Sequence, residues 1–145
     1  MLVKFFTIVL FVFSGAFFSL AQRANVKAPQ EKLGGYVIFE KDNHGLIATT
    51  KDIGQFDYPN ALIACENLSL NGFDDWRLPT QEEFELIHQK LNLKKMKSNN
   101  VFKAAWYWTS TEIDQEHAVT HNLNTGMQTN YFKRLNMRVL AVRAF

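Results

Sequence analysis

Cysteine, proline and net charge are all scarce in this 145-residue chain, and each shortage excludes a class of protein. The single cysteine, Cys65, cannot form a disulfide within the chain, so an exported form would be stabilised by packing alone. Only three prolines and no internal repeats are present, which argues against a fibrous or low-complexity protein. Basic and acidic residues nearly balance, with a formal net charge of +2. That balance argues against a nucleic-acid binder, which carries a marked basic excess.

The N-terminus has the pattern of an export signal. Lys4 supplies a positive charge, and residues 5–20 are almost wholly apolar. Small residues within 19–21 then precede Gln22, as a signal peptidase requires. A membrane-spanning helix needs about 20 apolar residues, and this run is shorter. We therefore expect residues 1–21 to be a cleaved signal peptide, with a secreted or periplasmic product and no membrane span after cleavage. The alternative is a retained membrane anchor.

The rest of the chain has the length of one domain with one core. Residues 22–33 are polar and lack apolar periodicity, so we interpret them as a flexible leader. Residues 34–145 form the predicted domain, and their aromatic side chains supply the area to bury.

The first half of the domain predicts a hairpin and a helix. Residues 36–39 and 46–49 are rich in β-formers and flank a turn sequence at 42–45. Asp57 suits a helix N-cap, and the helix is expected to end at a left-handed cap formed by residues 71–72.

Cys65 falls on the inward face of that helix. A buried structural thiol is the simplest interpretation, and a catalytic nucleophile is the alternative. No basic residue is close in sequence to lower its pKa, which favours the structural role.

A strand end, a proline stop and a helix start meet at residues 74–84. Trp76 is expected to point toward the core, and Pro79 excludes a helical conformation for the residue before it. Thr80 and Glu83 have the spacing of a capping box, in which each satisfies a backbone N–H of the other. The helix that follows has its apolar stripe at Phe84, Ile87 and Leu91, with His88 beside it.

Asp75 and Arg77 share one side of the extended segment at this corner. They could pair with each other, or Arg77 could reach another strand. Charge-assisted hydrogen bonds that hold the corner are one role for them. Binding of a ligand carboxylate or sulfate by Arg77 is the other, and Trp76 likewise fits the core better than a sugar platform.

A cluster of cations follows the second helix, in a segment (91–103) that we expect to be a solvated loop. It holds Lys94, Lys95 and Lys97, with Lys90 and Lys103 nearby. Such a run attracts anionic polysaccharide or phospholipid headgroups, or it is simply a soluble surface.

The second half of the domain predicts strands. Residues 106–111 are a strand by composition, and alternation makes Tyr107 or Trp108 a candidate exposed stacking surface unless both faces of the sheet are covered. Residues 118–132 predict a C-terminal hairpin around a glycine turn, and residues 139–142 a buried closing strand. Two helices packed on an antiparallel sheet give an α+β domain.

Three blocks of this sequence carry a resemblance to a known family. Residues 75–80 read DWRLPT, residues 107–112 read YWTSTE, and residues 139–143 read VLAVR. In this order they resemble the Lcl C-terminal domain family of exported bacterial proteins, over roughly residues 34–143. The resemblance implies a C-type-lectin-like fold, and it carries over no catalytic residues. The family is largely of unknown function, and no collagen-like repeat accompanies the domain here, so we do not carry over an adhesin role.

The residues give little support to enzyme or metal chemistry. Formylglycine-generating oxidases of related fold depend on a pair of cysteines, which Cys65 alone cannot supply. Zinc needs clustered ligands, whereas the four histidines are scattered. Asp74, Asp75 and Asp114 offer oxygen ligands for calcium, but no motif orders them. We therefore expect no cofactor, no metal site and no catalytic residues.

These observations favour a non-catalytic, exported carbohydrate-binding or interaction module whose partner is an extracellular glycan or another envelope component. A degenerate oxidase-like or hydrolytic enzyme and a purely structural envelope domain are the alternatives. The candidate ligand-binding residues are Arg77, Lys94, Lys95, Lys97, Tyr107 and Trp108.

Overall fold

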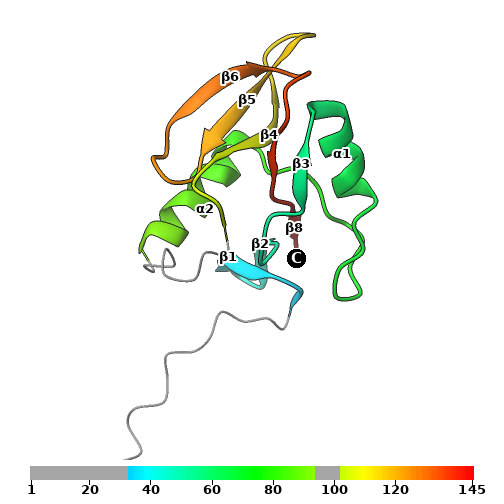
Figure 1. The fold of residues 1–145 in the computed structure, drawn as a ribbon. Helices are drawn as coiled ribbons and strands as arrows, with labels where there is room; N and C mark the ends of the chain where they lie inside the picture. The colour runs from blue at the N-terminus through cyan, green and yellow to red at the C-terminus, as the bar shows by residue number, and fades with distance from the viewer. Residues whose placement is uncertain (1–32, 94–101) are drawn as a thin grey trace, which may run out of the picture.

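Two helices and two β-sheets make up the part of the chain that the structure describes. The computed structural model describes residues 33–93 and 102–145, and the predicted signal peptide and almost all of the leader lie outside them. Neither described helix is long and apolar enough to cross a membrane. The predicted α+β class is confirmed (Figure 1). The elements are β1 (Tyr36–Lys41), β2 (His44–Ala48), β3 (Gly54–Phe56), α1 (Tyr58–Glu66), α2 (Gln81–Leu93), β4 (Trp106–Glu112), β5 (His117–Asn122), β6 (Gln128–Phe132), β7 (Met137–Val139) and β8 (Val142–Ala144).

The strands form a small and a large sheet. The small sheet has the order β1-β2-β8, and the large sheet has the order β3-β7-β4-β5-β6. All neighbours pair antiparallel except β4 and β7, which are parallel. In Figure 1 the large sheet lies above the small one, and the two helices lie on opposite sides of the molecule.

The single closing strand predicted at residues 139–142 is wrong. The chain instead makes two short strands, β7 in the large sheet and β8 in the small one, joined through Leu140 and Ala141. All four residues of 139–142 are completely buried. An unbroken apolar run predicts burial, but it cannot show which neighbours the backbone will pair with. The closing segment therefore links the two sheets.

Turn residues explain both predicted hairpins. Asp42 and Asn43 have φ of 52° and 64°, the left-handed conformation that a two-residue loop requires between β1 and β2. Gly126, with φ of 75°, turns the chain between β5 and β6. Both hairpins are confirmed by the antiparallel pairing of their strands.

Helix α1 begins as predicted but ends early. The carboxylate of Asp57 accepts a hydrogen bond of 3.1 Å from Asn60 N, and Pro59 lies in the first turn. The predicted end at residues 71–72 is wrong, because the helix stops at Glu66. Asn71 and Gly72 do have positive φ, but they form the turn of a separate bridge between Leu70 and Phe73.

Two hydrophobic clusters lie on opposite faces of the strands. One gathers around Phe84 and Ile87 of α2, and the other around Ala61 and Cys65 of α1. Neighbouring residues of β4 enter different clusters, Tyr107 the first and Trp108 the second. Both faces of β4 are therefore covered at Tyr107 and Trp108.

Trp76 belongs to the cluster beneath α1, where its side chain is 2% exposed and its indole donates to Phe73 O at 3.1 Å. We expect Trp76→Ala to lower the free energy of unfolding by about 3–5 kcal/mol, measured by denaturant titration. The matched control is Trp106→Ala, since that ring is only half-buried. A loss no larger than that of the control would show that Trp76 is not a core residue.

Candidate functional site

The predicted capping box is present at the start of α2. Glu83 N donates to Thr80 Oγ1 at 3.2 Å, and Thr80 N donates to Glu83 Oε2 at 2.9 Å. Two backbone N–H groups that a helix start would leave unpaired are thus satisfied. Pro79 O accepts from Ser110 N at 2.8 Å, which fixes the corner to β4.

Asp75 and Arg77 do not pair with each other, so that alternative is wrong. Both terminal nitrogens of Arg77 bind the Glu83 carboxylate at 2.7 Å, and Arg77 also donates to Leu78 O at 3.1 Å. Arg77 does reach another strand, but through its backbone, which pairs with Val142 of β8, and not through its side chain. Since this bidentate pair engages the end of the guanidinium, the geometry favours a structural role for Arg77 over ligand binding.

Asp75 instead binds Arg143 of β8, at 2.6 Å from Nε and 3.2 Å from Nη2. This hydrogen bond is the main cause that lowers the pKa of the Asp75 carboxyl. Arg143 is buried and its guanidinium lies 3.9 Å from the centre of the Phe73 ring. The Asp75–Arg143 pair therefore holds the corner against the closing segment, whereas the Arg77–Glu83 pair ties it to the start of α2.

The hypothesis of an exposed stacking side chain at Tyr107 or Trp108 is wrong, because both are completely buried. The hydroxyl of Tyr107 accepts from Lys103 N at 3.0 Å and donates to Lys103 O at 3.2 Å. Burial is the main cause that raises its pKa to about 12. The indole of Trp108 donates to Phe56 O at 2.9 Å. Both polar ends are used inside the protein, so neither ring is available to a ligand.

His121 of β5 is buried against α2. Its Nε2 lies 3.1 Å from Glu85 Oε2, and its ring stacks on Phe84 with 4.8 Å between centres. The ring of His88 is 5.7 Å away, and its Nδ1 lies 2.8 Å from Leu123 O. Within the described residues, no group of three or more His, Cys, Asp or Glu side chains could hold a metal ion.

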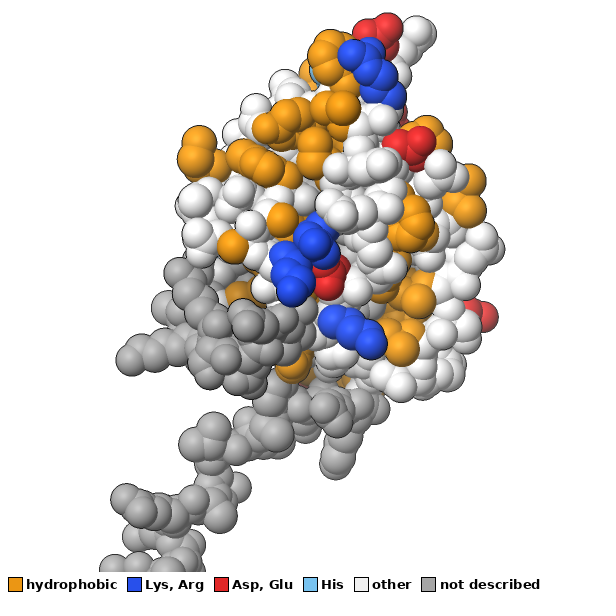
Figure 2. Space-filling model, viewed as in Figure 1, with side chains coloured by type: hydrophobic (Ala, Val, Ile, Leu, Met, Phe, Trp, Pro, Cys, Tyr) orange, Lys and Arg blue, Asp and Glu red, His pale blue; other side chains and the backbone are white. Residues whose placement is uncertain are grey.

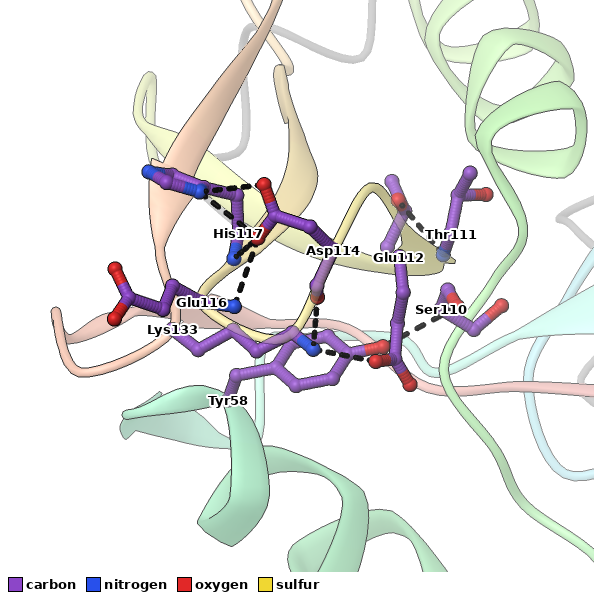
Figure 3. Close-up of polar contacts among 9 residues, drawn as sticks. Tyr58, Ser110, Thr111, Glu112, Asp114, Glu116, His117 and Lys133 are labelled. Carbon is purple, nitrogen blue, oxygen red and sulfur yellow. Dashed lines mark hydrogen bonds and ion pairs between the residues drawn. The ribbon is translucent and has the colours of Figure 1, made fainter.

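The turn between β4 and β5 carries a group of interlinked polar contacts on the rim (Figure 3). The Asp114 carboxylate accepts from Glu116 N at 2.8 Å, from His117 N at 2.7 Å and from the His117 ring at 2.9 Å. These bonds, the one from Glu116 N first, lower the pKa of Asp114. An open depression of about 370 Å³ lies over the turn.

Lys133 closes this turn from the other side. In Figure 3 its ammonium lies between the Glu112 carboxylate and the ring of Tyr58. It also donates to Asp114 O at 2.8 Å. Burial, followed by the charge of Glu112, raises the pKa of Tyr58 to about 12, so this phenol is a poor general base. The polar groups of the turn thus satisfy one another, which suits a rigid surface better than a reactive one.

A second rim surface is basic. Arg138 of β7 binds Asp52. The charges of these two residues both influence the pKa of the buried Tyr107. The hydroxyl of Tyr107 in turn bonds the backbone of Lys103. Lys51 is next to Asp52 in the chain, and both lysines are exposed. We call Lys51, Lys103 and Arg138, with Asp52 among them, the basic surface. Figure 2 shows basic side chains gathered around one acidic side chain near the middle of this face.

The sequence anticipated only part of the basic surface. Lys103 is the last cation of the predicted lysine run, whereas no local motif marks Arg138 as a binding residue. The signal for Arg138 was its position beside the closing segment, but its partner Asp52 is 86 residues away. Lys94, Lys95 and Lys97 lie outside the described residues.

Comparison with known proteins identifies the fold family. Residues 37–143, most of the chain, match the Lcl C-terminal domain. The chain belongs to the Lcl C-terminal domain family. The three blocks that resemble the family lie inside the match, at the corner, in β4 and in the closing segment. No match to this chain was found among curated proteins.

The Arg77–Glu83 pair predicts a pH dependence of stability. Partial burial raises the pKa of Glu83, but hydrogen bonds from Arg77 and Thr80, with the Arg77 charge, bring it below the ordinary value of 4.5. A carboxyl lowered in this way adds stability above its unfolded pKa and loses it as the pH falls through the folded pKa. Glu83→Gln should therefore cost about 1 kcal/mol at pH 7, since the pair is partly exposed, and the cost should shrink below about pH 4.5.

Denaturant unfolding between pH 7 and pH 3 measures this difference. Glu82→Gln is the matched control, because Glu82 is an exposed carboxylate in the same helical turn with no ion pair in the described structure. Equal costs for the two variants at every pH would contradict a stabilising Arg77–Glu83 pair.

Proposed function

We propose that this protein is an exported, non-catalytic module that binds an anionic extracellular glycan, or another anionic envelope component, through the basic surface. The proposal includes three expectations from the sequence: a C-type-lectin-like fold, a cleaved signal peptide at residues 1–21, and a secreted or periplasmic location. The observation that carries it is that the Arg138–Asp52 pair lies near Tyr107, whose hydroxyl bonds the backbone of the exposed Lys103, with the exposed Lys51 next to Asp52 in the chain.

The charges of the basic surface suit a polyanion. Three cations outnumber one carboxylate there, although the whole chain is almost neutral. The two lysines are exposed, so a sulfate or carboxylate can approach them with little desolvation. Arg138 is held by Asp52 and is only 25% exposed, so it contributes local field more than direct contact.

The basic surface is also rigidly mounted. Tyr107 pairs with Arg138 between β4 and β7, and its hydroxyl makes two hydrogen bonds with the Lys103 backbone. Since Tyr107 is completely buried, it anchors the backbone of both residues from beneath. Such a support favours binding because less loop entropy is lost. The participation of Lys94, Lys95 and Lys97 stays a prediction from the sequence.

A hydrolytic or oxidase-like enzyme is less well supported by the same structure. The buried Cys65 has its pKa raised to about 12, by burial first and by Glu66 second. A thiolate nucleophile is therefore disfavoured at this position.

Removing two charges tests the proposal. Lys51→Ala/Lys103→Ala should weaken binding to a sulfated glycan such as heparin by about tenfold at low salt, because two exposed charges are lost. The salt dependence of the dissociation constant should also flatten. Titration calorimetry at several salt concentrations measures both effects.

The matched control is Lys41→Ala/Arg134→Ala, which removes two exposed cations from elsewhere on the described surface. Equal weakening by both double variants would mean that only net charge matters. No binding of the unaltered protein to sulfated or neutral glycans, with or without calcium, would leave the purely structural envelope domain.

A further inference from the structure

Strand β6 forms an outer edge of the large sheet (Figure 1). It pairs with β5 on one side, and no described strand lies on the other. Exposure is high along its length: Gln128, Thr129 and Asn130 are exposed, and the apolar Met127 and Phe132 at its ends are 61% and 36% exposed. This edge takes no part in the basic surface.

The hydrogen bonds to β5 show which backbone groups of β6 face outward. Met127 O accepts from Asn122 N at 2.8 Å, and Lys133 N donates to Glu116 O at 2.7 Å. Backbone groups in an antiparallel pair alternate between the two sides of the strand. The odd-numbered residues therefore face β5, and Gln128, Asn130 and Phe132 present their N–H and C=O groups to the outside.

The other sheet edges are protected and β6 is not. β1 has a register shift between Val37 and Phe39 and carries Glu40 and Lys41, which are common defences against strand addition. Both backbone groups of Val142 in β8 are bonded to Arg77. β3 is only three residues long.

The sequence of β6 has no such defence. Gln-Thr-Asn-Tyr-Phe contains no charge, no proline and no glycine, and three of its residues are good strand formers or aromatics. An edge of this kind is a template for another strand.

We infer that β6 is a self-association edge, at which two copies of this chain pair antiparallel about a two-fold axis through Asn130. Because Asn130 faces outward, its N–H and C=O would each bond to the Asn130 of the second copy. Phe132 N–H would then donate to Gln128 O of the second copy, and Phe132 N–H of the second copy would donate to Gln128 O of the first. The Phe132 carbonyl, which already accepts from Leu135 N at 2.9 Å, would receive Gln128 N–H as a second donor.

A second copy fits this edge because the strand is complementary to itself. In the symmetric register Thr129 lies opposite Tyr131, a β-branched and aromatic pair that stabilises sheets. Gln128 lies opposite the exposed Phe132, and no like charges meet within residues 128–132. A two-fold axis also closes the assembly at two chains, since each β6 edge is used once. The strands are short, so the dimer should be weak and concentration-dependent.

Sedimentation equilibrium of the full chain, as the expression host processes it, tests the dimer. The mass should rise with concentration from that of one chain toward twice that value. Asn130→Pro should remain monomeric, because it removes the N–H that would bond to the second copy. The pairing with β5 is kept, since that N–H faces away from β5. Hydrogen exchange should show Asn130 and Phe132 amides protected only at concentrations where the dimer forms. The control variant is Asn124→Lys, which changes an exposed residue of the β5–β6 turn away from the outer edge.

A charge exchange tests the register. Asn130→Lys and Asn130→Asp should each be monomeric at low salt, because the two-fold axis brings like charges together. A mixture of the two should dimerise again. Asn124→Lys adds the same charge at an exposed turn position and should dimerise like the unaltered chain.

A monomer at every concentration would overturn the inference. So would a dimer that both Asn130→Lys and Asn130→Pro leave intact, or a mixture of the two charged variants that stays monomeric. A chain that stays monomeric while its β6 captures a strand of another protein would also overturn it, since the edge would then have a different occupant.

Discussion

The attachment of the corner segment to the closing strand is the constraint on which the rest of the structure depends. Arg77 N donates to Val142 O at 2.9 Å, and Val142 N donates to Arg77 O at 2.8 Å. Next to this backbone pair, the Asp75 carboxylate binds the buried Arg143. The corner also starts α2, and the closing segment joins both sheets, so these few bonds connect a helix and two sheets. The first and last blocks of the family resemblance are in direct contact here.

This arrangement explains why the recognisable residues are not the ones that bind in our proposal. Arg77 and Asp75 use their charges on Glu83 and Arg143, and the aromatic rings of β4 fill the core on both of its faces. Burying a cation such as Arg143 is costly unless it is paired, which makes Asp75 necessary rather than optional. Because these interior side chains are used in packing, both proposed binding sites lie on the exposed rim. One is the basic surface, and the other is the β6 edge.

Most local patterns in the sequence predicted the structure correctly, apart from the end of α1, but they did not predict the non-local pairing. The capping box of Thr80 and Glu83 and the turn at Asp42–Asn43 depend on neighbours within a few residues, and both are confirmed. The closing segment was predicted as one strand because four buried apolar residues have no period that shows a change of sheet. The part of the basic surface around Arg138 was not predicted for a related reason: Asp52 and Arg138 meet only after the chain has folded. The burial of both Tyr107 and Trp108, one of the two outcomes that the sequence left open, depends on helices on both sides of β4.

A double-mutant cycle on Asp75 and Arg143 tests the central claim most directly. The free energy of unfolding is measured for the unaltered protein, Asp75→Asn, Arg143→Leu and the double variant. If the pair holds the corner, Asp75→Asn leaves a buried cation without its partner, and the double variant should cost less than the sum of the two single variants. The expected coupling is about 0.5–3 kcal/mol. Strictly additive losses would contradict the claim that this contact ties the corner to the closing strand.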